Sequence, residues 1–132
     1  MVYLIYGSPC SGKTTWIKEH KQRGDLVCDV DYLYSAITMD NPHDAELYTH
    51  EVACELQTAL SDIIRDRKGN WKNAYVVSIA NTQEKLDEAK ERVHADEVIF
   101  IDTPYETCME RAKERPFYFQ FLIQEWFETR TI

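Results

Sequence analysis

Short apolar runs alternate with amphipathic stretches along the whole chain. Each run is rich in Val, Ile, Tyr or Leu and ends at Gly, Asp or Asn, which is typical of buried β-strands. The runs cover residues 2–6, 26–31, 74–80 and 98–101. Near-continuous apolar strands separated by helices predict an α/β fold, a four-stranded parallel sheet with helices on both faces.

Between the runs, apolar residues recur at spacings of three and four, which predicts helices. The first helix covers residues 13–21 and stops before Gly24. The longest covers residues 45–67 and carries Val52, Leu56 and Leu60 on one face. Residues 41–44 form either a turn or a helix start.

Two further helices are indicated by their start signals, and more follow at the end of the chain. Asn81 with Glu84 resembles a capping box, and Thr103 followed by Pro104 and Glu106 is a second start of the same kind. The last helices run through residues 115–116 to about 129. Right-handed crossovers then bring the carboxyl ends of all four strands to one edge of the sheet, where such sheets bind ligands.

The composition fits one ordinary globular domain spanning residues 1–132. It is 44% hydrophobic and 29% charged, without low-complexity tracts or repeats. Fifteen Lys and Arg against 23 Asp and Glu give a net charge of −8, which argues against coating nucleic acid by general electrostatics. With no long apolar stretch and four scattered cysteines, we expect a cytoplasmic protein whose thiols stay reduced.

The segment from Gly7 to Thr14 matches G-x-x-x-x-G-K-[ST], between a predicted strand and a predicted helix. Glycines let successive backbone N–H groups point inward at an anion, and the helix N-terminus adds positive potential. Lys13 adds a charge on the β- and γ-phosphates, and Thr14 is a candidate Mg²⁺ ligand. The expected phosphate contacts are Gly7, Ser8, Pro9, Cys10, Ser11, Gly12, Lys13, Thr14 and Thr15. Cys10 lies in the middle of this loop, where it either only fills space or has a thiol pKa lowered by the surrounding N–H groups.

Two carboxylates, Asp29 and Asp31, alternate at the end of the second predicted strand, so both are expected on one face. One alternative is that one caps the next helix while the other is solvated. The functional alternative makes Asp31 the base that accepts the proton of an acceptor hydroxyl and Asp29 a metal ligand. A competing metal residue is Asp102, which follows four apolar residues and would favour an ATPase.

Arg111 and Arg115 lie four residues apart, so a helix would place them on one face. Two cations there are explained by an anion held between them, since arginine's fork matches phosphate oxygens. Alternatively, Arg111 pairs with Glu114 on a solvated face. The aromatic segment that follows, residues 117–127, has the helical spacing of core packing, with base stacking as the alternative.

Taken in order along nearly the whole chain, these motifs resemble the P-loop kinases of the polynucleotide kinase and zeta-toxin type, and small phage-type AAA-like ATP-binding proteins. The resemblance implies a P-loop NTPase fold, ATP and Mg²⁺ as cofactors, a base near the end of the second strand and arginines on the phosphates. By position these are Lys13, Thr14, Asp31, Arg111 and Arg115. The family often has a basic residue three positions after the base, where this chain has Tyr34.

The function predicted from the sequence is an ATP-dependent kinase. It would transfer the γ-phosphate of ATP to a hydroxyl of a nucleoside, a nucleotide or a nucleic acid, the last at a 5′ end or a hydroxymethylated base. The alternatives are a small P-loop ATPase and an ATP-binding module that lacks an acceptor. The partners are therefore ATP and a hydroxyl-bearing acceptor, without a membrane, and the sequence leaves the oligomeric state open.

Overall fold

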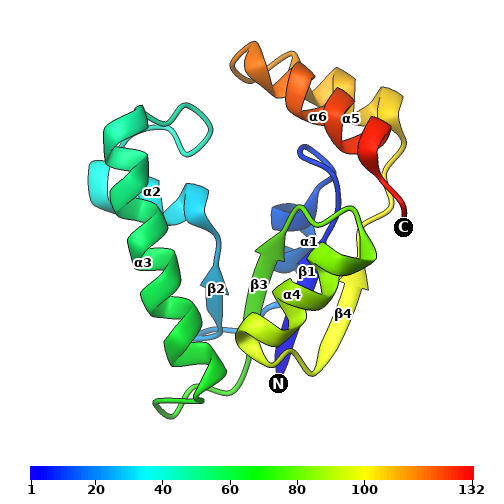
Figure 1. Ribbon diagram of the computed structural model, residues 1–132. Coiled ribbons are helices and arrows are strands. Elements are labelled where there is room, and N and C mark those ends of the chain that lie inside the picture. The colour runs from blue at the N-terminus through cyan, green and yellow to red at the C-terminus, as the bar shows by residue number, and fades with distance from the viewer.

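The predicted strands form one parallel sheet in the computed structural model, which describes residues 1–132 (Figure 1). The strands are β1 (Val2–Tyr6), β2 (Leu26–Cys28), β3 (Ala74–Ser78) and β4 (Glu97–Phe100). Their order is β2-β3-β1-β4, with β1 at the centre between β3 and β4. The predicted fold class, an α/β structure with a four-stranded parallel sheet, is confirmed.

Six helices surround this sheet. They are α1 (Lys13–His20), α2 (Val30–Thr38), α3 (Leu47–Arg65), α4 (Gln83–Val93), α5 (Tyr105–Ala112) and α6 (Tyr118–Thr129). Figure 1 shows α4 in front of the sheet, α3 to one side of it next to β2, α1 behind it, and α5 with α6 beyond the carboxyl ends of the strands. None of the helices has the length and apolar character needed to cross a lipid bilayer.

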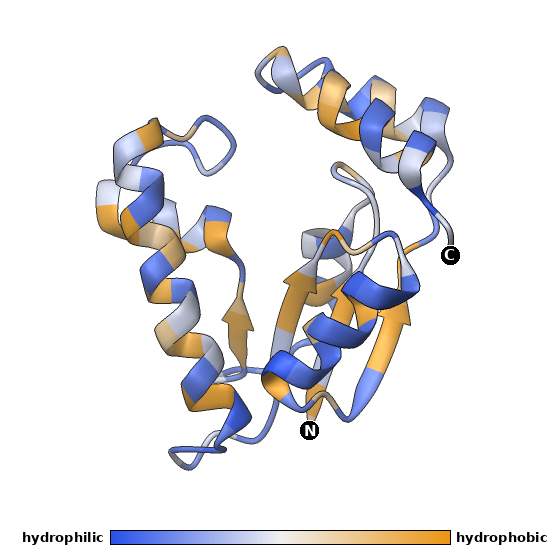
Figure 2. Cartoon of the chain, in the orientation of Figure 1, coloured by the Kyte–Doolittle hydropathy of each residue, from blue (hydrophilic) through white to orange (hydrophobic).

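The alternation of residues along β1 explains why helices cover both faces. Val2 and Leu4 point into a core completed by Ile64 of α3 and by residues of α4, whereas Ile5 packs with Ile17 of α1 on the other side. Because every second side chain of a strand faces the same way, one apolar run supplies two cores. Figure 2 shows the apolar character of the strands beside the largely hydrophilic α4.

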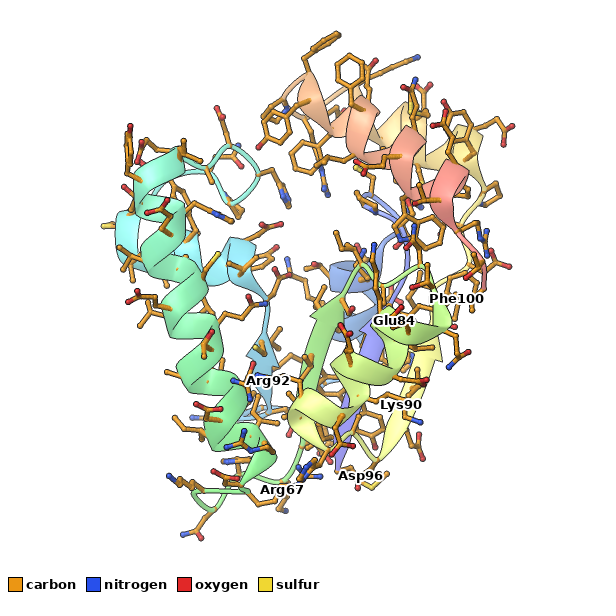
Figure 3. The ribbon with its side chains drawn as sticks, in the orientation of Figure 1. Arg67, Glu84, Lys90, Arg92, Asp96 and Phe100 are labelled. Atoms are coloured by element: carbon orange, nitrogen blue, oxygen red, sulfur yellow. The ribbon has the colours of Figure 1, made fainter.

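Ion pairs join the lower ends of α3 and α4, close to Arg67, Arg92 and Asp96, which Figure 3 labels. Arg92 of α4 lies 2.8 Å from the Asp62 carboxylate of α3. Arg67, just beyond α3, donates to the carbonyl oxygens of Val93 and His94 and pairs with Asp96 at 3.2 Å. These contacts fix α3 where it leaves the sheet.

The second strand is shorter than predicted, and the face assigned to its carboxylates is wrong. β2 ends at Cys28, Asp29 is the N-cap of helix α2, as one of the two alternatives for these carboxylates predicted, and Asp31 lies in the first turn of that helix. The Asp29 side chain accepts a hydrogen bond from the Asp31 backbone N–H at 3.0 Å. An aspartate that caps a helix stabilises the helix and ends the strand before it. The apolar run alone does not show where that change occurs.

Two predicted helix starts are also corrected. Thr82 rather than Asn81 caps α4, because its hydroxyl accepts from the Lys85 N–H at 3.2 Å. Asn81 instead donates to the Trp126 carbonyl and the Thr129 hydroxyl of α6. Helix α5 begins after Pro104 without a side-chain cap, since the Thr103 hydroxyl donates to the Ser11 carbonyl at 2.7 Å. In both cases the residue predicted to cap a helix, Asn81 or Thr103, instead forms hydrogen bonds to a segment distant in the chain.

The common helix face predicted for Arg111 and Arg115 is wrong as well. Arg111 lies in the last turn of α5, but that helix ends at Ala112 and Arg115 lies in the turn before α6. Arg111 is bonded to the carbonyl of Cys10 and has no ion pair with Glu114. Pro116 explains the break, since a residue before proline is disfavoured in helical conformation.

Candidate functional site

The segment Gly7–Thr15 wraps around the carboxyl end of β1 and leads directly into α1. Gly12 has φ of 97° and is the N-cap of α1, without a side chain that uses the first free N–H groups. Gly7 is needed for close approach, because a Cβ there would lie 2.8 Å from the Ile101 carbonyl. These two positions leave backbone N–H groups available to an anion at the helix N-terminus.

Lys13 is buried and turned back onto its own loop. Its ammonium donates to the carbonyl oxygens of Gly7 at 3.0 Å and Ser8 at 2.7 Å. Burial lowers the pKa of Lys13 to about 8, and the carboxylate of Asp29 opposes that shift. The Lys13 ammonium is therefore already positioned at the loop before a phosphate binds there.

Helix α5 and its preceding loop hold the crest of the phosphate loop from outside. Arg111 Nη1 donates to the Cys10 carbonyl at 3.1 Å, and the Thr103 hydroxyl donates to Ser11. Cys10 is buried against Cys108 in the small core formed with α5 and α6. Burial raises the pKa of the Cys10 thiol, which contradicts an acidified cysteine and agrees with a space-filling one.

Asp29 lies beneath the loop and is 7% exposed. Its Oδ1 caps α2, and its Oδ2 accepts from the Thr14 hydroxyl at 3.4 Å. A hydroxyl and a carboxylate fit Mg²⁺, which is commonly bound by few protein oxygens together with substrate phosphates and water. No cluster of three or more His, Cys, Asp or Glu residues offers an independent metal site. The donor set therefore suits a metal that arrives with a nucleotide.

Asp31 faces the cleft from the first turn of α2 and is about one-third exposed. Burial, followed by the repulsion of Asp29, raises the pKa of Asp31 to about 6. Its Oδ2 lies 3.7 Å from Nδ1 of His43, whose own pKa is lowered by burial and by Arg115. A carboxylate with a raised pKa is a better proton acceptor than an ordinary aspartate.

A cleft of about 760 Å³ joins these groups. Its lining includes the loop residues Pro9–Thr15, both Asp29 and Asp31, and Arg115. Arg115 approaches from the opposite side, with its guanidinium 5.2 Å from the centre of the Phe119 ring. Arg111 and Asp102 are not among the lining residues, and Asp102 is exposed at the far edge beyond β4. The structure thus brings together the phosphate loop, the two aspartates and one of the two arginines.

The aromatic segment at the end of the chain divides between core and surface. Phe119, Ile123 and Trp126 are buried, as their spacing predicted, and Trp126 donates to the Ile79 carbonyl at 2.8 Å. Tyr118, Phe119 and Leu122 also form one wall of the cleft. Packing is therefore the main role of this segment, and one end of α6 borders the site.

Sequence reasoning missed three cleft residues outside the motifs. His43 comes from the turn before α3, and His50 and Gln57 come from α3 itself. The spacing of seven residues places His50 and Gln57 on the same side of the helix. That polar stripe was visible in the sequence, but the apolar stripe of the same helix was used to orient it.

Comparisons with known proteins agree with this geometry. A family model described as an AAA domain matches residues 2–122. Among solved structures, a chain from the "Structure of Pnkp1/Rnl/Hen1 complex" matches with a TM-score of 0.59 and 15% identity. The match covers 83% of this chain and 38% of that chain, so this protein spans well under half the length of its structural neighbour. No curated protein matches the sequence significantly.

Proposed function

Because the chain belongs to the AAA domain family, we propose that it is a P-loop kinase of the polynucleotide kinase and zeta-toxin type. It transfers the γ-phosphate of ATP to a hydroxyl group of a nucleoside, nucleotide or nucleic acid. The observation that carries the proposal is the position of Asp31 in the cleft that also contains Lys13 and the phosphate loop. An ATPase needs no such second carboxylate in addition to the one proposed to hold the metal.

Each residue has one role in the proposed transfer. Asp31 accepts the proton of the acceptor hydroxyl while the hydroxyl oxygen forms a bond to the γ-phosphorus. The bond from that phosphorus to the β–γ bridging oxygen breaks, and ADP leaves with the electron pair. Lys13 and Arg115 lie on either side of the cleft and neutralise the phosphate oxygens.

Three further residues act through position rather than through proton transfer. Thr14 and Asp29 would hold Mg²⁺, which when bound offsets charge on the β- and γ-phosphate oxygens. Arg111, which the sequence suggested as a phosphate ligand, instead supports the loop through the Cys10 carbonyl. One of its five N–H donors is used there, and the residue does not line the cleft.

The test is incubation with ATP labelled at the γ-phosphate and a panel of hydroxyl-bearing acceptors. Transfer of label to an acceptor is the expected result. Release of label only as free phosphate would mean that the protein is an ATPase and not a kinase. ATP binding without transfer or release would leave a binding module.

A further inference from the structure

The segment from Asp29 to Ile64, which we term the acceptor arm, carries the whole net charge of the protein. It contains α2, the following turn and most of α3, and it has eight Asp and Glu but no Lys or Arg. The rest of the chain has 15 acidic and 15 basic residues, so the net charge of −8 belongs to this arm. Figure 1 shows α2 and α3 as a separate arm beside the sheet.

The arm forms one side of the cleft. Its lining residues are Asp29, Val30, Asp31, Pro42, His43, Ala45, Leu47, His50 and Gln57. The only Lys and Arg in the lining are Lys13 and Arg115, which belong to the loop and to the segment before α6. On the side of the arm, the cleft therefore has two carboxylates, two imidazoles and one amide but no Lys or Arg.

An acceptor must lie against this arm if Asp31 is the base. The attacking hydroxyl and the leaving ADP are roughly in line on opposite sides of the γ-phosphorus. The hydroxyl contacts Asp31, so the body of the acceptor extends on the Asp31 side of the phosphate, towards α3. This step rests on the proposed kinase function.

The helix N-termini of the arm are also closed to phosphate. The carboxylate of Asp29 caps α2, and the carboxylate of Glu46 caps α3 by accepting from the N–H groups of Tyr48 and Thr49. These bonds lower the pKa of Glu46, so a negative charge already occupies that helix end. Both of the usual protein partners of phosphate, cations and free helix N-termini, are missing from the arm.

Tyr34 does not replace them. Its side chain is 1% exposed, and its hydroxyl accepts from the Glu46 N–H at 3.0 Å and donates to Asp40. The residue fixes the turn before α3 from inside the arm. It therefore has no free group to offer to an acceptor phosphate.

We propose that the acceptor is a phosphate-free nucleoside rather than a nucleotide or a nucleic-acid end, and that His50 and Gln57 contact it. An imidazole and a carboxamide supply hydrogen-bond donors and acceptors that match the polar edges of a base or sugar. Leu47 adds apolar surface at the same side of the cleft. A phosphate on the acceptor would instead be desolvated next to Asp29 and Asp31, and Arg115, the cation nearest to the arm in the lining, is assigned to the transferred phosphate.

The test compares acceptors that differ only in phosphate. Labelled ATP is incubated with nucleosides, with their 5′-monophosphates and with 5′-hydroxyl oligonucleotides, including one with a hydroxymethylated base. We expect the nucleosides to have at least about tenfold higher kcat/KM, which corresponds to the repulsion of one poorly screened charge. Equal or better use of phosphate-bearing acceptors would overturn the inference while leaving the kinase intact. Labelling of no acceptor at all would overturn the proposed function itself.

A charge variant sharpens the result. Gln57→Lys places a cation in the cleft, and we expect it to raise kcat/KM for monophosphates relative to nucleosides by about three- to fivefold, as for one solvent-accessible ion pair. Thr58→Lys adds the same charge at the next residue, which is exposed and outside the lining, and should leave the ratio unchanged. An equal response of the two variants would mean that Gln57 does not face the acceptor.

Discussion

The phosphate loop and the acceptor arm border the same cleft but are built in opposite ways. The loop is mostly buried, and Lys13, Ser8 and Ser11 are tied to it or to α5 by hydrogen bonds. The arm is acidic and exposes several large apolar side chains, including Leu47 and Tyr48. A preformed phosphate site costs little to organise when ATP binds. If the protein is the kinase we propose, ATP binding depends on the preformed loop, whereas the choice of acceptor depends on the arm.

The largest expected effect separates chemistry from donor binding. Asp31→Asn keeps the shape of the site but removes the proton acceptor, so we expect the transfer rate to fall by about 10²- to 10⁴-fold. ATP affinity, measured by titration calorimetry, should be nearly unchanged. Asp44→Asn is the matched control, because Asp44 is exposed in the turn before α3 and does not line the cleft. Transfer at the parental rate in the Asp31 variant would remove Asp31 as the base.

A second substitution tests the cation opposite the arm. Arg115→Ala removes the guanidinium over Phe119 and should lower the transfer rate by about 10²-fold, the usual cost of losing one transition-state donor. Lys113→Ala, two residues away, removes an exposed lysine paired with Glu110 and should have little effect. If both variants have the same modest effect in single-turnover assays, Arg115 does not contact the phosphates.

A third substitution affects the loop alone. Lys13→Ala removes a charge-assisted hydrogen bond to phosphate, so the Kd for ATP should rise by about 10- to 100-fold. Lys18→Ala, on the exposed side of the same helix, is the control. Unaltered ATP affinity in the Lys13 variant would exclude the loop as the nucleotide site.

The smallest expected effect is confined to the arm. Tyr34→Phe leaves the Glu46 N–H without its partner and should lower the free energy of unfolding by about 1 kcal/mol. Tyr48→Phe, with a side chain that is 75% exposed, should be neutral in the same urea titration. ATP affinity is expected to stay constant in both. A loss of ATP affinity in the Tyr34 variant would show that the two regions are coupled.

The same contrast separates what the sequence predicted from what it did not. The strands and the phosphate loop follow from local patterns, since apolar runs and a glycine motif carry their own signal. Asp29 was predicted in a strand but caps α2, because its side chain makes a local bond to the Asp31 N–H. Thr103 was predicted as a helix cap but supports the phosphate loop, because its hydroxyl bonds to Ser11, which is distant in the chain. For Arg115 the helix break decided the outcome, and it left only one arginine in the cleft.

The acceptor arm is inserted between two strands that lie side by side. β2 pairs directly with β3, so everything from Asp29 to Asn73 is a single crossover connection between adjacent strands. The loop of β1, the edge strand β4 and the α5–α6 pair all lie outside it. Another arm would fit the same sheet if it kept Asp29 and Asp31 at its start, the ion pair of Asp62 with Arg92 and the core contact of Ile64. Under the proposed kinase function, the rest of the arm is then the part of the chain that can vary with the acceptor, since only two junctions join it to the sheet.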